Sequence, residues 1–94
     1  MTKILFENIK GELIFSITLD LEKRLIPEVI IEEYRGRAAK LCYPQIEQAS
    51  YDSLESLFNH YCDTKNIPLA KLIEHIREQG FYTPYNPNLR IKIE

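Results

Sequence analysis

The chain has too few glycines and cysteines for several common kinds of site. Its 3 glycines are isolated, so no glycine-rich loop that could hold a phosphate group is present. Its 2 cysteines, Cys42 and Cys62, could form at most one disulfide, and without a secretory signal we expect both to be reduced and largely buried. No run of about 18 apolar residues occurs, so no membrane span is predicted.

An excess of charge of either sign is also missing. With 12 basic and 14 acidic residues the formal net charge is −2, which predicts no global attraction to nucleic acid or to an anionic membrane. The 94 residues are 45% apolar and 28% charged, which is the usage of an ordinary globular domain. We therefore expect one domain over residues 1–94. No export signal is recognised, and the expected location is cytoplasmic.

Alternation of apolar and polar residues predicts a β-hairpin at the start of the chain. Residues 12–21 keep a period of two, and Lys10-Gly11 would form the turn back from residues 3–9, because glycine takes a positive φ at low cost. The face expected to be buried carries Leu13, Phe15, Ile17, Leu19 and Leu21. An isolated hairpin is not stable, so it must pack on helices or gain a third strand.

Residues 28–43 allow two interpretations. Pro27 would open a helix and Pro44 would prevent its continuation. The apolar arc of this helix would consist of Ile30, Ile31, Tyr34, Ala38, Leu41 and Cys42. Gly36 costs such a helix about 1 kcal/mol, so the rival is a pair of strands, 29–34 and 38–43, that turn between them. We predict the helix.

Two further helices have recognisable ends. The first covers residues 50–63, with Ser50 as a candidate N-cap. The second runs from Pro68 to Gln79 and ends at Gly80, where a left-handed residue is needed. Alternation near the C-terminus, in residues 89–93, predicts a final edge strand. The expected fold class is α+β: an N-terminal β-hairpin, two to three helices, and a short C-terminal strand completing a small antiparallel sheet.

No arrangement of residues predicts catalysis or metal binding. His60 and Cys62 lie about 160° apart around one helix and so cannot ligate the same ion. Cys42 and Cys62 both project toward apolar surfaces, so a thiol beside a base is not expected. We therefore predict a protein that is not an enzyme and that needs no cofactor and no metal.

The apolar spacing from Leu57 to Phe81 resembles that of helix-turn-helix segments. In winged-helix proteins this resemblance implies that helix 68–79 enters the DNA major groove and that the 81–93 hairpin touches the DNA backbone. Charge argues against nucleic acid as the partner, because residues 44–63 contain no lysine or arginine. A winged-helix-like DNA-binding regulator is therefore the alternative function, not the first one.

An acidic segment together with an aromatic loop favours a protein partner. Phe81, Tyr82 and Tyr85 are interleaved with prolines, and large rigid rings suit interface anchors. The acidic residues expected to join them are Glu47, Asp52 and Glu55. We predict a small protein-binding module that acts as an inhibitor, immunity protein or regulator of a larger protein. An open sheet edge also predicts a homodimer.

Overall fold

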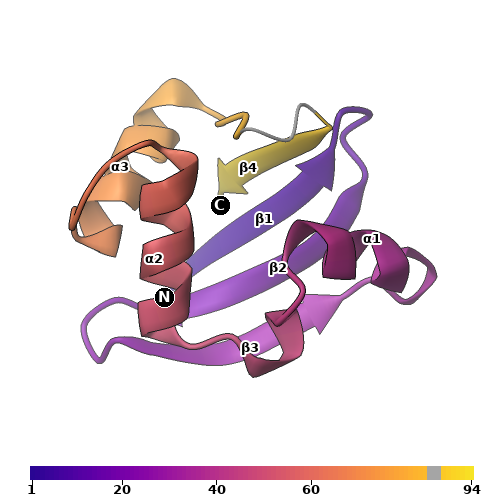
Figure 1. Cartoon of the computed structure of the whole chain (residues 1–94), viewed down its shortest axis with the longest axis horizontal. Helices are drawn as coiled ribbons and strands as arrows, with labels where there is room; N and C mark the ends of the chain where they lie inside the picture. Colours follow the sequence, from indigo (N-terminus) through magenta and orange to yellow (C-terminus); the bar gives the residue numbers. More distant parts are fainter. Residues whose placement is uncertain (85–87) are drawn as a thin grey trace.

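The computed structural model describes residues 1–84 and 88–94, which form one antiparallel sheet with helices on one of its faces (Figure 1). The strands follow the order β3-β2-β1-β4 across the sheet. They are β1 (Thr2–Asn8), β2 (Leu13–Asp20), β3 (Leu25–Ile31) and β4 (Leu89–Ile93). The helices are α1 (Gly36–Cys42), α2 (Tyr51–Tyr61) and α3 (Leu69–Gln79), with short 3-10 turns at Glu33–Arg35 and Ile46–Gln48. The predicted α+β fold class is confirmed.

The N-terminal hairpin forms as predicted. In the β1–β2 ladder, Ile4 lies opposite Ile17 and Phe6 lies opposite Phe15. Gly11 takes a φ of 80° in the turn between the two strands. The hairpin gains both kinds of support that it needs, because β3 pairs with β2, β4 pairs with β1, and helices cover one face. β4 lies at an edge of the sheet, as expected.

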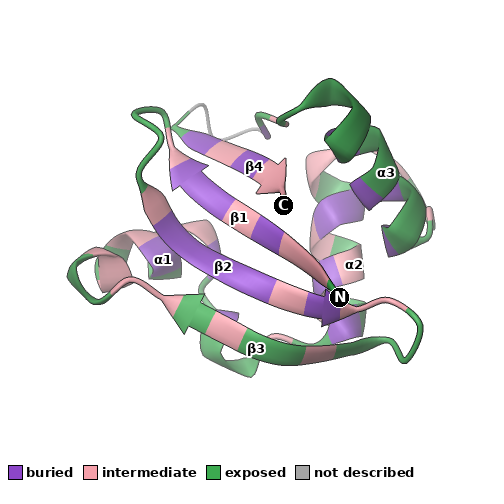
Figure 2. Cartoon of the chain, turned by 180° about the vertical axis from the view of Figure 1, so that it is seen from behind, coloured by how far each residue is buried: buried purple, intermediate pink, exposed green. Residues whose placement is uncertain are grey.

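The core lies between the sheet and the two longer helices. Phe6 and Phe15 stack with their ring centroids 4.2 Å apart, and the Phe58 ring of α2 lies 6.2 Å from that of Phe6. Ile73 and Ile76 of α3 are fully buried in the same cluster. Seen from behind in Figure 2, the opposite face of the sheet has no described helix across it. The helices therefore form a single layer.

The prediction of one helix over residues 28–43 was wrong. The chain runs as a strand to Ile31, passes through the 3-10 turn and only then forms the seven-residue α1. The rival pair of strands was right for the first half alone. The reason is tertiary: as a strand, residues 25–31 satisfy the hydrogen-bonding groups of β2 that a helix would leave open. Pro27 is tolerated because an edge strand needs donors on one side only.

The observed structure of residues 28–43 buries different side chains from those that the predicted helix would bury. Tyr34 and Leu41, which the predicted helical arc would bury, are each 76% exposed. Ala39, which lay outside that arc, is fully buried. α1 therefore rests on the sheet through a small side chain and presents large apolar side chains outward.

The two longer helices begin at well-defined caps. The Ser50 hydroxyl accepts the Ser53 N–H at 3.2 Å, and the Ser53 hydroxyl accepts the Ser50 N–H at 3.0 Å. Pro68 precedes α3 and offers no side-chain cap. The Glu55 carboxylate of α2 accepts the Leu69 N–H instead, at 2.9 Å. A side chain of α2 thus fixes the start of α3.

Replacing Gly80 or Gly36 by alanine should have opposite effects on the free energy of unfolding. Gly80 ends α3 at a φ of 88°, so Gly80→Ala should lower the free energy of unfolding by about 1–2 kcal/mol. Gly36 has a φ of −51° at the start of α1, and no atom lies within 4 Å of an added Cβ. Gly36→Ala should therefore raise the free energy of unfolding by about 0.4–1 kcal/mol. Urea unfolding followed by circular dichroism measures both, and effects of the same sign would contradict these backbone conformations.

Candidate functional site

The aromatic residues predicted to bind a partner differ in how they are held. Tyr82 exchanges two backbone hydrogen bonds of 2.8 Å with Ile91, and its hydroxyl donates to the Tyr61 carbonyl at 2.6 Å. The Phe81 ring is exposed and lies 5.0 Å from the guanidinium of Arg90. Tyr85 lies outside the described residues. Tyr82 therefore has a structural role in joining the segment to β4 and α2, while Phe81 remains accessible.

The predicted acidic residues meet a cation from the β2–β3 turn. An Arg24 nitrogen lies 3.4 Å from a carboxylate oxygen of Asp52 and 3.8 Å from one of Glu55. The Arg24 guanidinium also lies 5.1 Å from the centroid of the Tyr51 ring. Glu47 is exposed on the 3-10 turn before α2. The acidic surface of α2 is thus partly neutralised by a residue that is distant in sequence.

The acidic and aromatic halves of the predicted surface are not brought together. Tyr82 contacts Tyr61 at the C-terminal end of α2, whereas Asp52 lies in the first turn of that helix. At 1.5 Å per residue the two positions on α2 are roughly 14 Å apart. These residues therefore do not form one continuous contact surface.

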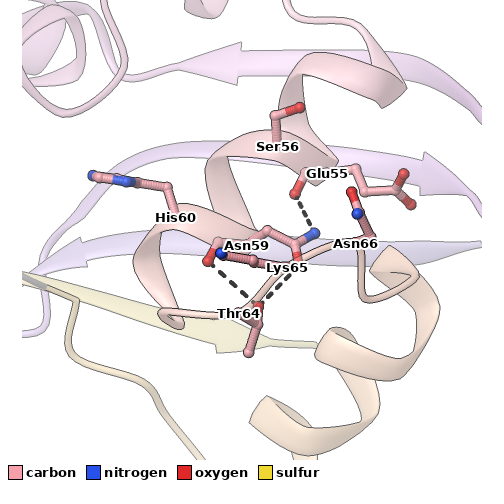
Figure 3. A pocket seen from close by; sticks show the side chains of 7 residues that line it. All are labelled: Glu55, Ser56, Asn59, His60, Thr64, Lys65 and Asn66. Atoms are coloured by element: carbon pink, nitrogen blue, oxygen red, sulfur yellow. Dashed lines mark hydrogen bonds between the residues drawn. The ribbon is translucent and has the colours of Figure 1, made fainter.

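An open polar groove of about 470 Å³ follows α2 and the connection to α3 (Figure 3). The Asn59 amide donates to the carbonyls of Glu55 and Ile67 and accepts the Thr64 hydroxyl and the Ile67 N–H, each at 2.9 Å. All four hydrogen-bonding positions of this amide are therefore used within the protein. Asn59 holds the α2–α3 connection in place and has no position left for a ligand.

The same groove contains no nucleophile beside a base. In Figure 3, the side chains of Ser56 and His60 point in different directions. Across residues 1–84 and 88–94, no group of three or more histidines, cysteines and acidic residues could hold a metal ion. In that part of the chain, no helix has the length and apolarity required to cross a bilayer.

A different surface gathers exposed apolar side chains. At the end of the sheet where α1 lies beside the β1–β2 turn, there is a hollow of about 220 Å³. The hollow is lined by Asn8, Ile14, Ala38, Leu41, Cys42 and Asn88. Leu41, one of these lining residues, is 76% exposed. Ile9 follows Asn8 in the sequence and is 52% exposed, and Tyr34 in the 3-10 turn before α1 is 76% exposed. We call the hollow and these three side chains the end patch.

A network of polar contacts fixes the end patch. Arg35 forms an ion pair with Glu12, and the Asn8 amide donates to the same carboxylate at 3.1 Å. The Asn8 hydrogen bond, and then the charges of Arg35 and Lys10, lower the pKa of Glu12 below its usual value. The Arg35 guanidinium lies 4.8 Å from the Tyr34 ring. The turn after β1 and the segment before α1 are thus tied together, which positions Tyr34 at this end of the sheet.

The sequence interpretation missed the end patch because it treated residues 28–43 as one amphipathic helix. A signal was present: Glu32-Glu33 interrupts the apolar arc, and Gly36 follows three residues later. Such a break suits the end of a strand and the start of a separate short helix. Tyr34 in the 3-10 turn and Leu41 in α1 are then both exposed, and Ala38 is half-buried.

Comparisons with protein-family models, with curated proteins and with solved structures found no match to this chain. Function has to be inferred from surface chemistry. In the described residues the Asn59 amide is satisfied within the protein and the acidic residues of α2 are paired with Arg24, while the end patch presents apolar side chains to solvent.

The two thiols should react slowly in the native protein. Burial raises the pKa of Cys42 and of Cys62, which lowers the thiolate fraction. At about pH 8, near the pKa of a free thiol, a chromogenic disulfide reagent should therefore label the folded chain much more slowly than the urea-unfolded chain. Because the folded pKa values are raised, the stability that the protonated thiols contribute is lost as the pH rises above about 8.5. Both cysteines are half-buried, less than the sequence predicted, so equal labelling rates in the two states would contradict even this partial shielding.

Proposed function

We propose that the chain is a small non-enzymatic protein-binding module that acts as an inhibitor, immunity protein or regulator of a larger protein. The observation that carries this proposal is the end patch. Single exposed apolar side chains are common on proteins, but a cluster around an apolar hollow is typical of an interaction surface. Tyrosine, as at Tyr34, is also enriched in protein interfaces.

The dimensions of the hollow favour a protein partner over a small molecule. Its volume of about 220 Å³ is below the roughly 300–1,000 Å³ of small-molecule sites. The side chains of Leu41, at the hollow, and of Tyr34, in the turn before α1, are mostly exposed and open to a partner. A hollow with an apolar surround suits one inserted side chain and its neighbours.

The contacts predicted from the sequence remain secondary candidates. Phe81, Asp52 and Glu47 are exposed and accessible to a partner. Tyr82 and Glu55 are half-buried and already hold β4 and α3 in place, so their substitution would affect folding together with binding. The cytoplasmic location stays a prediction.

The winged-helix-like DNA-binding function also stays a prediction. Lys71 and His75 are exposed on α3, but Arg77 is paired with Glu74 at 2.5 Å. Tyr82 pairs with Ile91, and β4 joins the main sheet by pairing with β1. This low density of free cations on α3 offers few phosphate contacts.

A comparative capture experiment tests the protein-binding proposal. Tagged wild type, a Tyr34→Ser/Leu41→Ser variant, and a Leu25→Ser control are used to isolate partners from the native cell. Leu25 is 55% exposed at the opposite end of β3, so it matches the exposure but not the location. We expect the same protein to be retained by wild type and control. The patch variant should lose about 1–3 kcal/mol of binding free energy per anchor.

Two results of this experiment would contradict the proposal. A partner that the double variant retains at wild-type level would show that the end patch is not its binding surface. Recovery of nucleic acid without a protein partner, reduced by Lys71→Glu, would favour the DNA-binding alternative. Circular dichroism of each variant confirms that the fold is intact.

The homodimer predicted from the sequence is best assigned to β3. The outer edge of β4 pairs with Tyr82, whereas the outer edge of β3 makes no backbone hydrogen bond to another described segment. The Glu32 N–H bonds to the Ile14 carbonyl, and the alternation of an antiparallel ladder then points the N–H groups of Val29 and Ile31 outward. Pro27 removes one further outward donor, so any pairing is expected to be weak.

Light scattering at micromolar concentration tests this association. We expect a mean mass above 11.1 kDa that rises with concentration and falls on dilution. Val29→Pro removes one outward N–H group without removing a hydrogen bond to β2, so it should yield a folded monomer. A wild-type particle of 11.1 kDa at all concentrations would exclude the dimer.

A further inference from the structure

We infer that the outer edge of β3 binds an extended segment of a partner protein as an added strand, and that this segment places an apolar side chain beside Ile30 and a lysine or arginine beside Glu28. The inference concerns a second surface of the molecule and does not depend on the end patch. It is carried by the backbone groups and side chains that the register of the sheet places along this edge.

The backbone of β3 has hydrogen-bonding groups open at its outer edge. The Glu32 N–H bonds to the Ile14 carbonyl. The alternation of the antiparallel ladder therefore turns the N–H and C=O groups of Val29 and Ile31 away from β2, and no described segment bonds to them. An extended segment that runs antiparallel along β3 can exchange hydrogen bonds with both residues, which is how strand addition supplies affinity.

Two side chains next to these groups are exposed on the open face of the sheet. Val29 and Ile31 pack partly against the core. Glu28 and Ile30 alternate with them and so lie on the opposite face, across which Figure 2 shows no described helix. Ile30 is 40% exposed. Glu28 is exposed, and no cation of the described residues lies at ion-pair distance from it.

The register also fixes what lies on the inner side of Glu28. It is opposite Thr18, and the next residue in that row is Lys3 of β1. Lys3 is two strand spacings, roughly 10 Å, from Glu28 and pairs with Glu94 at 3.9 Å. Arg24, in the turn before β3, is engaged by the acidic residues of α2. The charge of Glu28 is thus unmatched within the described residues, while its outer side is open.

These positions define the sequence of the incoming segment. The residues that face Glu28 and Ile30 are in non-hydrogen-bonded pairs, where side chains approach most closely. Because the two chains run in opposite directions, the residue facing Ile30 comes two positions before the one facing Glu28. The expected pattern is an apolar residue, any residue except proline, then lysine or arginine. Proline is excluded at the middle position because that residue donates its N–H to Val29.

A second copy of the chain fits the same edge less well. When the outward groups of two β3 strands are aligned about a two-fold axis, Val29 faces either Val29 or Ile31 of the second copy. Glu28 then faces Ile30 or Glu32 of the second copy, and in neither register does it face a cation. Like charges directly opposite each other destabilise a strand pair. A basic partner segment should therefore displace the weak self-association at this edge.

A displayed library of random peptides, selected on the wild-type chain, tests the inference. Amide hydrogen exchange, followed by NMR for each complex, shows which peptides occupy the edge. Such peptides should slow exchange of the outward N–H groups of Val29 and Ile31, while the N–H of Ile30, which points to β2, is the internal control. We expect these peptides to carry the apolar and basic residues two positions apart.

Three outcomes of the selection would overturn the inference. Edge-protecting peptides may not have an acidic or neutral residue where the cation is expected, and peptides that resemble residues 28–32 would show that the edge takes a second copy instead. Absence of any peptide that protects Val29 and Ile31 would show that the edge takes no added strand. Each of these leaves the end patch, and with it the proposed function, intact.

Charge reversal gives a second readout on the edge-protecting peptides. Glu28→Lys should weaken their binding roughly three- to tenfold, because it replaces a cross-strand attraction by a repulsion. Glu78→Lys is the matched control, since Glu78 is also exposed and outside the ion pairs of the described residues, on α3 at the β4 side of the sheet. Circular dichroism confirms that both variants are folded. Equal affinities of the two variants would overturn the inference.

Discussion

The burial of one face of the sheet beneath α2 and α3 is the constraint on which the rest of the structure depends. Phe6 and Phe15, paired across β1 and β2, stack on each other, and Phe58 of α2 packs against Phe6. Burial of each such side chain is worth about 1.5–3 kcal/mol. Because side chains alternate along a strand, a slip of one residue would turn this apolar face to solvent. The register of the central hairpin is therefore set by the helices that cover it.

The helices in turn are held by polar groups that reach across elements. Glu55 of α2 caps α3 where Pro68 offers no cap of its own. Asn59 uses its whole amide on the chain that connects the two helices. A buried amide left without partners costs about 1–3 kcal/mol, so these contacts restrict how α3 can be placed. Glu55, which the sequence suggested as a partner contact, thus serves together with Asn59 to assemble the helical layer.

Most of the fold could be predicted because its signals are local. The β2 strand, the Ser50 cap and the Gly80 stop depend on neighbouring residues, and each lies where it was expected. Burial within β2 departs from the expected alternation, because Ile14 and Ser16 are buried while Leu13 is half-buried. β3 could not be predicted in this way, since its pairing with β2 competes with a helical pattern over residues 28–43 and is decided by distant contacts. The contacts made by the predicted site residues were harder still to predict. Arg24 forms ion pairs with the acidic residues of α2 only in the folded chain, and no local sequence pattern predicts such a pairing.

The error over residues 28–43 and the proposed function have the same physical origin. Once residues 25–31 are used as an edge strand, too few residues remain for a long helix, and α1 is left with Ala39 as its buried contact. A helix so short cannot bury both Tyr34 and Leu41, so they stay on the surface at an energetic cost. The Glu12–Arg35 pair and the Asn8 hydrogen bond hold the neighbouring turn in place beside them. If the proposed function holds, an exposed apolar surface that is held by such contacts would lose little ordering entropy when a partner covers it.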